Sequence, residues 1–156
     1  MQVRDERFWI GAAWGLVAIL IMSVVEGAFL LFGTENMREA MPIVLAARVI
    51  ARVAGLKTLT AGVFVGATIV QFLYGALWAG LLAASTAKVT LGKGVVVSLG
   101  LMLISFVFLW PFGGQVFAFS TSGGAWLASL LVHLTYGASI GILGGRHEPE
   151  LIEEPV

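Results

Sequence analysis

Three polar side chains interrupt long apolar stretches of the sequence, and they are the residues that could do chemistry. They are Glu26, Gln71 and His133. A charged group at the centre of a membrane span costs roughly 2.5–3.5 kcal/mol, so such a residue normally faces protein or water. With a rise of ~1.5 Å per residue, their depths from one membrane surface are about 9, 16 and 13 Å, and the three could meet inside a helix bundle.

Two kinds of role fit these residues. Glu26 could be a proton or cation site, with His133 as its relay or hydrogen-bond partner. The structural alternative is a protonated, neutral Glu26 that is clasped to His133 or Gln71. Such a polar bond between helices fixes their register and contributes about 1 kcal/mol.

The two tyrosines of the chain lie in the same short sequence pattern. Residues 71–76 read Gln-Phe-Leu-Tyr-Gly-Ala, and residues 133–138 read His-Leu-Thr-Tyr-Gly-Ala. In a helix, Tyr74 and Tyr136 lie one turn beyond the polar residue and on the same face. The repetition predicts a duplicated pair of helices. Its tyrosines would either hydrogen-bond across a pseudo-twofold axis or each bond a backbone carbonyl.

The composition predicts an integral membrane protein. Hydrophobic residues make up 59% of the 156 residues, charged residues 12%, and the mean hydropathy is +0.98. A soluble domain carries roughly 25% charge. The net charge is zero, and no basic patch is large enough to predict nucleic-acid binding. The lack of cysteine excludes disulfides, thiolate metal sites and thiol catalysis.

Four apolar stretches are each close to the ~20 residues that a helix needs to cross a bilayer. The predicted spans are 8–32, 59–84, 94–112 and 124–145. The first is too long for the core of a cleavable signal peptide, so we expect it to be retained. We expect a single transmembrane domain over residues 1–146, followed by a short, acidic, mobile tail at 147–156.

A short helix is predicted at 42–54, between the first two spans. Pro42 suits the first turn of a helix and Gly55 suits its end. Arg48 and Arg52 are four residues apart and hence on one face. We expect this helix to lie at the membrane surface with both arginines toward lipid headgroups. The alternative is an ordinary connecting helix that packs on the bundle.

The orientation depends on the connection at 111–124, which has no charge and is rich in phenylalanine. Trp110 and Trp126 at its edges suit a membrane interface, and the loop could enter the bilayer edge or contact a partner. Lys and Arg divide five against four between the two sides. Because the loop favours export, we expect a multi-pass protein of the inner (plasma) membrane with both termini cytoplasmic.

With four spans, both helix pairs enter the membrane from the same side, which makes the predicted repeat parallel. Glycines four residues apart allow two helices to approach closely. Such pairs are Gly11/Gly15, Gly62/Gly66, Gly137/Gly141 and Gly141/Gly145. The predicted fold is an all-α four-transmembrane-helix bundle, a parallel tandem repeat of helix pairs with a short interfacial helix after the first span.

The histidines give little support to a cofactor. A membrane b-type haem usually needs two histidines, and the chain has only His133 and His147. His147 lies at the end of the same span, too far along it to face His133 across a haem. A partner chain would have to supply the second ligand. The sequence contains no metal-spaced cluster, no catalytic triad and no phosphate-binding glycine loop. We therefore expect no enzyme, no metal and no resident cofactor, with quinone or haem at a partner interface as the exception.

The arrangement resembles a broad group of small four-helix bacterial inner-membrane proteins. The shared features are Pro-x-x-Leu-Ala at 42–46 and His-x-x-Tyr-Gly-Ala-x-x-Gly at 133–141. Gln71 departs from the histidine expected at its position in such proteins, which weakens any two-histidine site. The resemblance implies a helical membrane protein and carries no settled function.

The leading functional prediction is a non-catalytic accessory subunit of a larger membrane complex, for example a respiratory or redox complex. Its expected partners are membrane lipids and other integral membrane subunits. One alternative is a small transporter or channel component that conducts protons or a solute past Glu26, Gln71 and His133. Another is a quinone- or lipid-binding subunit with Tyr136 and His133 as polar contacts in an apolar cleft.

Overall fold

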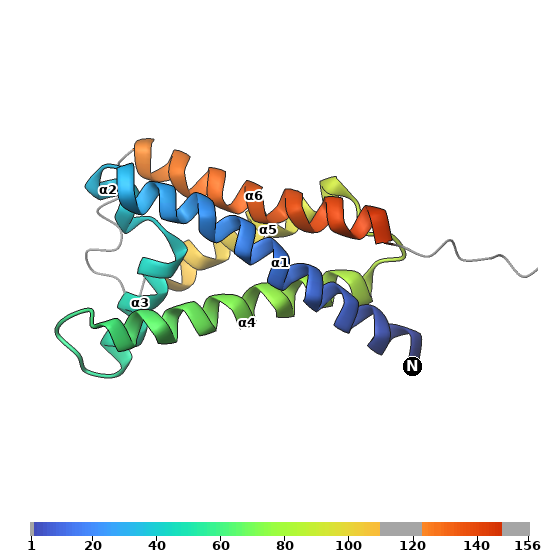
Figure 1. Ribbon diagram of the computed structural model, residues 1–156, viewed down its shortest axis with the longest axis horizontal. Coiled ribbons are helices and arrows are strands. Elements are labelled where there is room, and N and C mark those ends of the chain that lie inside the picture. The colour runs from blue at the N-terminus through green and yellow to red at the C-terminus, as the bar shows by residue number, and fades with distance from the viewer. Residues whose placement is uncertain (1, 110–122, 148–156) are drawn as a thin grey trace, which may run out of the picture.

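The computed structural model describes residues 2–109 and 123–147, and all regular structure in these ranges is helical. Figure 1 shows how the helices are arranged. They are α1 (Gln2–Phe32), α2 (Glu35–Glu39), α3 (Pro42–Val53), α4 (Ala61–Ser85), α5 (Leu91–Leu109) and α6 (Gly123–His147). The loop predicted at 111–124 lies almost wholly outside the described residues, as does the tail from residue 148 onward.

Three of the described helices are long and apolar enough to cross a membrane. These segments are Arg4–Phe32, Ala61–Ser85 and Gly123–Arg146, and Leu91–Ser105 in α5 is a shorter apolar helix. Large hydrophobic side chains point outward from the long helices: Val24 is 75% exposed and Leu73 is 64% exposed. An outer surface of this kind, on helices of this length, suits a protein in lipid.

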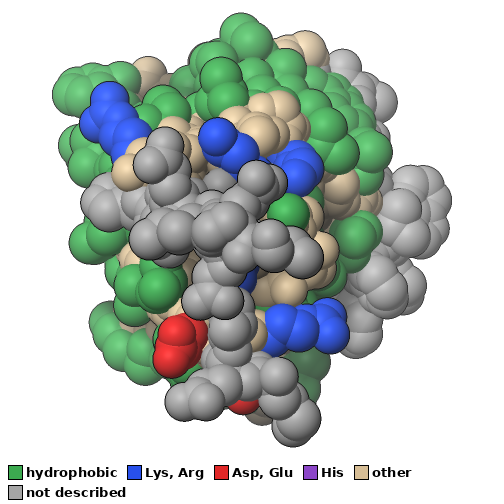
Figure 2. Space-filling view, turned by 90° about the vertical axis from the view of Figure 1, so that its right-hand side faces the viewer, with side chains coloured by type: hydrophobic (Ala, Val, Ile, Leu, Met, Phe, Trp, Pro, Cys, Tyr) green, Lys and Arg blue, Asp and Glu red, His purple; other side chains and the backbone are tan. Residues whose placement is uncertain are grey.

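One end of the bundle carries both basic and acidic side chains (Figure 2). The start of α1, the end of α4, the start of α5 and the end of α6 meet there, and Figure 2 shows Lys and Arg side chains at this end with hydrophobic side chains around them. Arg7 donates to the carbonyl oxygens of Ala83 at 3.0 Å and Thr86 at 2.8 Å. It thereby satisfies carbonyls that the end of α4 leaves without a helical partner.

The four long helices pack in the order α4, α1, α6, α5. α1 and α4 make the most extensive contact, followed by α5 with α6 and α1 with α6, whereas α4 and α5 hardly touch. Figure 1 shows α1 beside α6 at one end and beside α4 at the other. The ring of helices is therefore closed on three sides and open between α4 and α5.

Glycine makes two of the closed contacts. A Cβ atom at Gly15 would lie 2.8 Å from Cα of Ala76 on α4, and one at Gly137 would lie 2.9 Å from Cα of Val95 on α5. The prediction of close approach was right for Gly11/Gly15 and Gly137/Gly141. It was wrong for Gly62/Gly66, because the nearest atoms to a Cβ at either position lie 3.8 Å away. Gly145 is equally open, so Gly141/Gly145 is not a contact pair.

The helix predicted after the first span is α3. It begins at Pro42, and the chain leaves it through Gly55, whose φ of 69° is easy only for glycine. The amide of Leu56 donates to the carbonyl of Ala51 at 2.8 Å and closes this end. α3 crosses the end of the bundle and packs on α4 (Figure 1). Its position at a membrane surface stays a prediction.

Candidate functional site

Glu26 is the centre of a buried polar clasp that joins three helices. The residue is 2% exposed. Its Oε2 accepts a hydrogen bond from Nε2 of Gln71 on α4 at 2.5 Å, and its Oε1 accepts from the backbone amide of Ile43 on α3 at 3.2 Å. One carboxyl group on α1 therefore holds both the middle of α4 and the start of α3.

The clasp compensates for a helix start that lacks a cap of its own. Met41 occupies the N-cap position of α3 and supplies no side-chain acceptor. The first amides of a helix have no partner within the helix, and its N-terminus carries a partial positive charge. Glu26 supplies an acceptor from another helix. The bond to Gln71 is one of the two contacts named in the structural alternative, and the neutral form of Glu26 stays a prediction.

Gln71 keeps one polar atom without a partner. The residue is 8% exposed, and its Oε1 makes no hydrogen bond to any described residue. The amide nitrogen of Gln71 faces Glu26 in this structure, and the carboxyl oxygen accepts its hydrogen bond. An unpaired buried acceptor costs about 1–3 kcal/mol, so this atom is a candidate contact for something that the chain itself does not provide.

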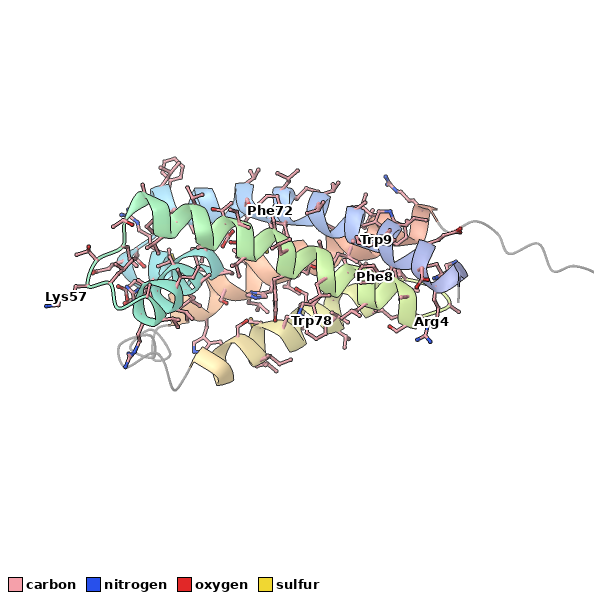
Figure 3. The ribbon with its side chains drawn as sticks, turned by 90° about the horizontal axis from the view of Figure 1, so that it is seen from below. Arg4, Phe8, Trp9, Lys57, Phe72 and Trp78 are labelled. Carbon is pink, nitrogen blue, oxygen red and sulfur yellow. The ribbon has the colours of Figure 1, made fainter. Side chains whose placement is uncertain are left out.

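A cavity of about 480 Å³ lies beside the clasp, between α4 and α5. α3 lines one part of it, and α1 and α6 contribute the remaining walls. Most of the lining is aliphatic or aromatic, and Figure 3 shows α5 diverging from α4, with Trp78 of α4 labelled. The lining residues with polar side-chain atoms are Gln71, Tyr74, Trp78, Ser105, Ser129, His133 and Tyr136.

His133 lines the cavity from α6, and the partner of one of its ring nitrogens is defined. Its Nδ1 lies 2.8 Å from the carbonyl oxygen of Ser129. Because a carbonyl oxygen only accepts, Nδ1 carries the proton, and in the neutral ring Nε2 is then a hydrogen-bond acceptor. The backbone of His133 is also fixed, because Oγ of Ser98 on α5 donates to its carbonyl oxygen at 2.5 Å. No hydrogen bond joins His133 to Glu26 among the described residues.

The two tyrosines occupy unlike positions. Tyr136 is 3% exposed, and its hydroxyl donates to the carbonyl oxygen of Gly75 at 2.5 Å. This matches the predicted alternative of a bond to backbone. Tyr74 is 38% exposed and packs edge-on against Trp78, with ring centroids 6.0 Å apart. Its hydroxyl also lies near Ser105. Tyr74 therefore belongs to the outer part of the cavity and Tyr136 to its inner wall.

The arginines of α3 differ from each other. Arg48 forms an ion pair with Glu39, at 2.5 Å between its guanidinium and the carboxylate. Arg52 is exposed and also interacts within the protein. The contact of both arginines with lipid headgroups stays a prediction. No group of three or more metal-binding side chains occurs in the part of the chain that the structure describes.

Several cavity residues were not predicted as site residues. Trp78, Ser105 and Ser129 were not among the predicted site residues. Trp78 could have been found from spacing, because it follows Gln71 by seven residues and Tyr74 by four, on the same helix face. The α3 lining could not have been found that way, because spacing within one helix says nothing about how another helix crosses it.

Comparison with known proteins adds no assignment. A scan against protein-family models finds no match. Neither a search of curated proteins nor a search of solved structures finds a significant match. The resemblance to small bacterial inner-membrane proteins therefore stays a prediction, and functional inference depends on the clasp and the cavity.

Proposed function

We propose that this protein is a membrane protein that binds a largely apolar molecule, of the lipid or quinone class, in the cavity between α4 and α5. The cavity carries the proposal. Its volume of about 480 Å³ falls in the range of small-molecule sites, and its apolar walls with a few polar groups are typical of them. The proposal includes binding and no bond-making step.

The open side of the bundle supports entry from the bilayer. α4 and α5 hardly touch, whereas every other pair of neighbouring long helices packs closely. A molecule with an apolar chain could enter sideways between them and leave the end of its chain among the lipids. Its polar end would then lie near Gln71 and His133, which are deeper in the cavity than the exposed ring of Tyr74.

The proposed topology follows from the helix order. We infer that α5 is a fourth span that pairs with α6 as α1 pairs with α4, in a parallel repeat with both described ends on one side. The similarity of residues 71–76 to 133–138 supports this. Orientation in an inner membrane with cytoplasmic ends is part of the same proposal.

The other functions predicted from the sequence have less support. Both carboxyl oxygens of Glu26 accept hydrogen bonds from protein groups, which suits a structural clasp better than a conducted proton or cation. Exposed apolar side chains suit lipid as well as a partner helix, so they do not favour an accessory subunit. That role remains a proposal which copurifying chains would support.

A cavity-filling variant tests the proposed function. Ala46 on α3 lines the cavity, and Ala13 on α1 is exposed on the outer surface. We expect wild-type protein purified in mild detergent to carry a bound lipid or quinone detectable by mass spectrometry of an organic extract. Ala46→Trp should lower its occupancy by about tenfold or more, because the ring takes up the binding space. Ala13→Trp is the matched control and should retain it.

Equal, background amounts of every lipid in all three proteins would contradict the proposal. So would a lipid that is retained equally by wild type and Ala46→Trp, because it would then lie on the outer surface.

A further inference from the structure

The polar groups of the cavity indicate which kind of molecular head it can hold. In the neutral His133 ring, Nδ1 donates to Ser129, so Nε2 can only accept. Oε1 of Gln71 is a second acceptor without a partner. These two acceptors on the cavity lining could each accept a hydrogen bond from a donor on the occupant.

The same cavity also offers donors. Nε1 of Trp78 is a buried donor. The hydroxyl of Tyr74 lies near it and near Ser105. A group that both donates and accepts would therefore satisfy more of these side chains than a group that only accepts. A hydroxyl is the simplest such group.

Other common membrane heads fit less well. Among the described residues no Lys or Arg lines the cavity, so a phosphate or an ionised carboxylate would find no counter-charge from them. The carbonyl oxygens of an oxidised quinone only accept, and they would meet the acceptors of His133 and Gln71 without a shared proton. The walls are otherwise aliphatic and aromatic, which suits an uncharged chain.

We propose that the cavity binds a membrane lipid whose head is a hydroxyl group, and that this hydroxyl donates to Nε2 of His133. Isoprenoid alcohols, diacylglycerols and quinols share this chemistry. The inference depends on the proposed function, because it assigns the head group of the molecule that the cavity would take.

A matched pair of probes separates the contribution of the head group to affinity from that of the apolar chain. Geranylgeraniol and its methyl ether have the same apolar chain, and only the alcohol can donate. Binding to purified wild-type protein can be measured by native mass spectrometry or by competition. We expect the alcohol to bind about three- to tenfold more tightly, the effect of one net hydrogen bond.

Variants of His133 test whether this residue causes the preference for the alcohol over the ether. In His133→Phe the ratio of alcohol to ether affinity should fall to about one, and in His133→Gln, which keeps an acceptor, part of the ratio should return. Leu131 is on the same helix, is exposed and does not line the cavity, so Leu131→Phe is the control and should leave the ratio as in wild type. If a His133 variant fails to fold, the comparison of alcohol and ether affinity on wild-type protein still tests the proposal.

The source of the hydroxyl is resolved by further probes. Decylubiquinol against decylubiquinone, and dioctanoylglycerol against its methyl ether, repeat the comparison for a quinol and a diacylglycerol. The pair with the highest affinity and a clear preference for the hydroxyl form identifies the source.

The outcomes distinguish the inferred hydroxyl head group from the proposed binding of an apolar molecule in the cavity. Binding of the alcohol and the ether with equal affinity would overturn the hydroxyl inference and leave the cavity as a general apolar site. Absence of binding by every probe would overturn the proposed function itself. A preference for decylubiquinone over decylubiquinol would also overturn the hydroxyl inference, because it would require a donor where we place an acceptor.

Discussion

The two halves of α5 meet the bundle in different ways. In the first half, Gly94 lies so close to α6 that a Cβ atom there would come within 2.9 Å of the backbone nitrogen of Gly141. Ser98 adds its hydrogen bond to the carbonyl of His133. In the second half, Leu101 and Ser105 continue the same face of the helix but line the cavity. One helix face thus changes from close packing to open space within about three turns.

This difference suggests what determines where the bundle closes. Lipid tails are as apolar as leucine, so hydrophobicity alone gives helices little reason to associate in a membrane. Close packing depends on small residues and on hydrogen bonds between helices. The first half of α5 has both, at Gly94 and Ser98. The second half has larger side chains, and α4 faces this region with Tyr74 and Trp78, so the helices stay apart.

The stability of the protein should be most sensitive to substitution of Glu26, whose clasp lies beside the cavity. Glu26→Ala would remove the acceptor of a buried donor on Gln71 and a partly buried donor on Ile43. We expect a loss of about 2–4 kcal/mol, because each unpaired buried donor costs about 1–3 kcal/mol. Thermal unfolding in a mild detergent would measure it, and Glu26→Gln should lose less because it keeps an acceptor.

Glu35 provides the control for this change. It lies in α2 and is exposed, so Glu35→Ala should alter stability by no more than about 0.5 kcal/mol. If Glu26→Ala were as stable as Glu35→Ala, the clasp would not hold α3 to the bundle, and the end wall of the cavity would need another explanation.

A substitution with an intermediate expected effect tests the closely packed first half of α5. Gly94→Ala places a methyl group against the backbone of α6 and should cost about 1–3 kcal/mol by overpacking. Gly100→Ala is the matched control on the same helix, because no atom lies within 4 Å of a Cβ there. It should be neutral or stabilising by up to about 1 kcal/mol, since alanine favours helix more than glycine does. Equal unfolding temperatures for the two variants would show that this contact is not close.

The sequence predicted the helices well because their signals are local. Pro42 and Gly55 mark the ends of α3, and long apolar runs mark the longer helices. The approach of Glu26 to Gln71 could also be predicted, because depth along a helix follows from counting residues. The wrong glycine pair, Gly62/Gly66, shows the limit. Spacing predicts that a helix face carries small residues but not which helix packs against that face.

The cavity could not be predicted for the same reason. Its existence depends on the divergence of α4 from α5, and both helices are apolar on several faces. The role of Glu26 at the start of α3 depends on how α3 crosses the end of the bundle, which no local pattern encodes. His133 was correctly chosen as a polar position, but its partner, the carbonyl of Ser129, is one turn back on its own helix.

The smallest expected effect compares two serines on the same face of α5. Ser98 is 0% exposed and donates to the carbonyl of His133, whereas Ser105 lines the cavity. Ser98→Ala should cost about 0.6 kcal/mol, and at most about 1.7 kcal/mol, the range measured for hydrogen bonds between membrane helices. Ser105→Ala should cost less, because the hydroxyl of Tyr74 beside it belongs to a partly exposed residue, and it should weaken ligand binding if the Ser105 hydroxyl contacts the occupant. Unfolding midpoints and probe affinities measured on both variants separate the two effects. If Ser105→Ala destabilised the protein as much as Ser98→Ala does, its hydroxyl would be holding two helices together, and the second half of α5 would be less open than the cavity indicates.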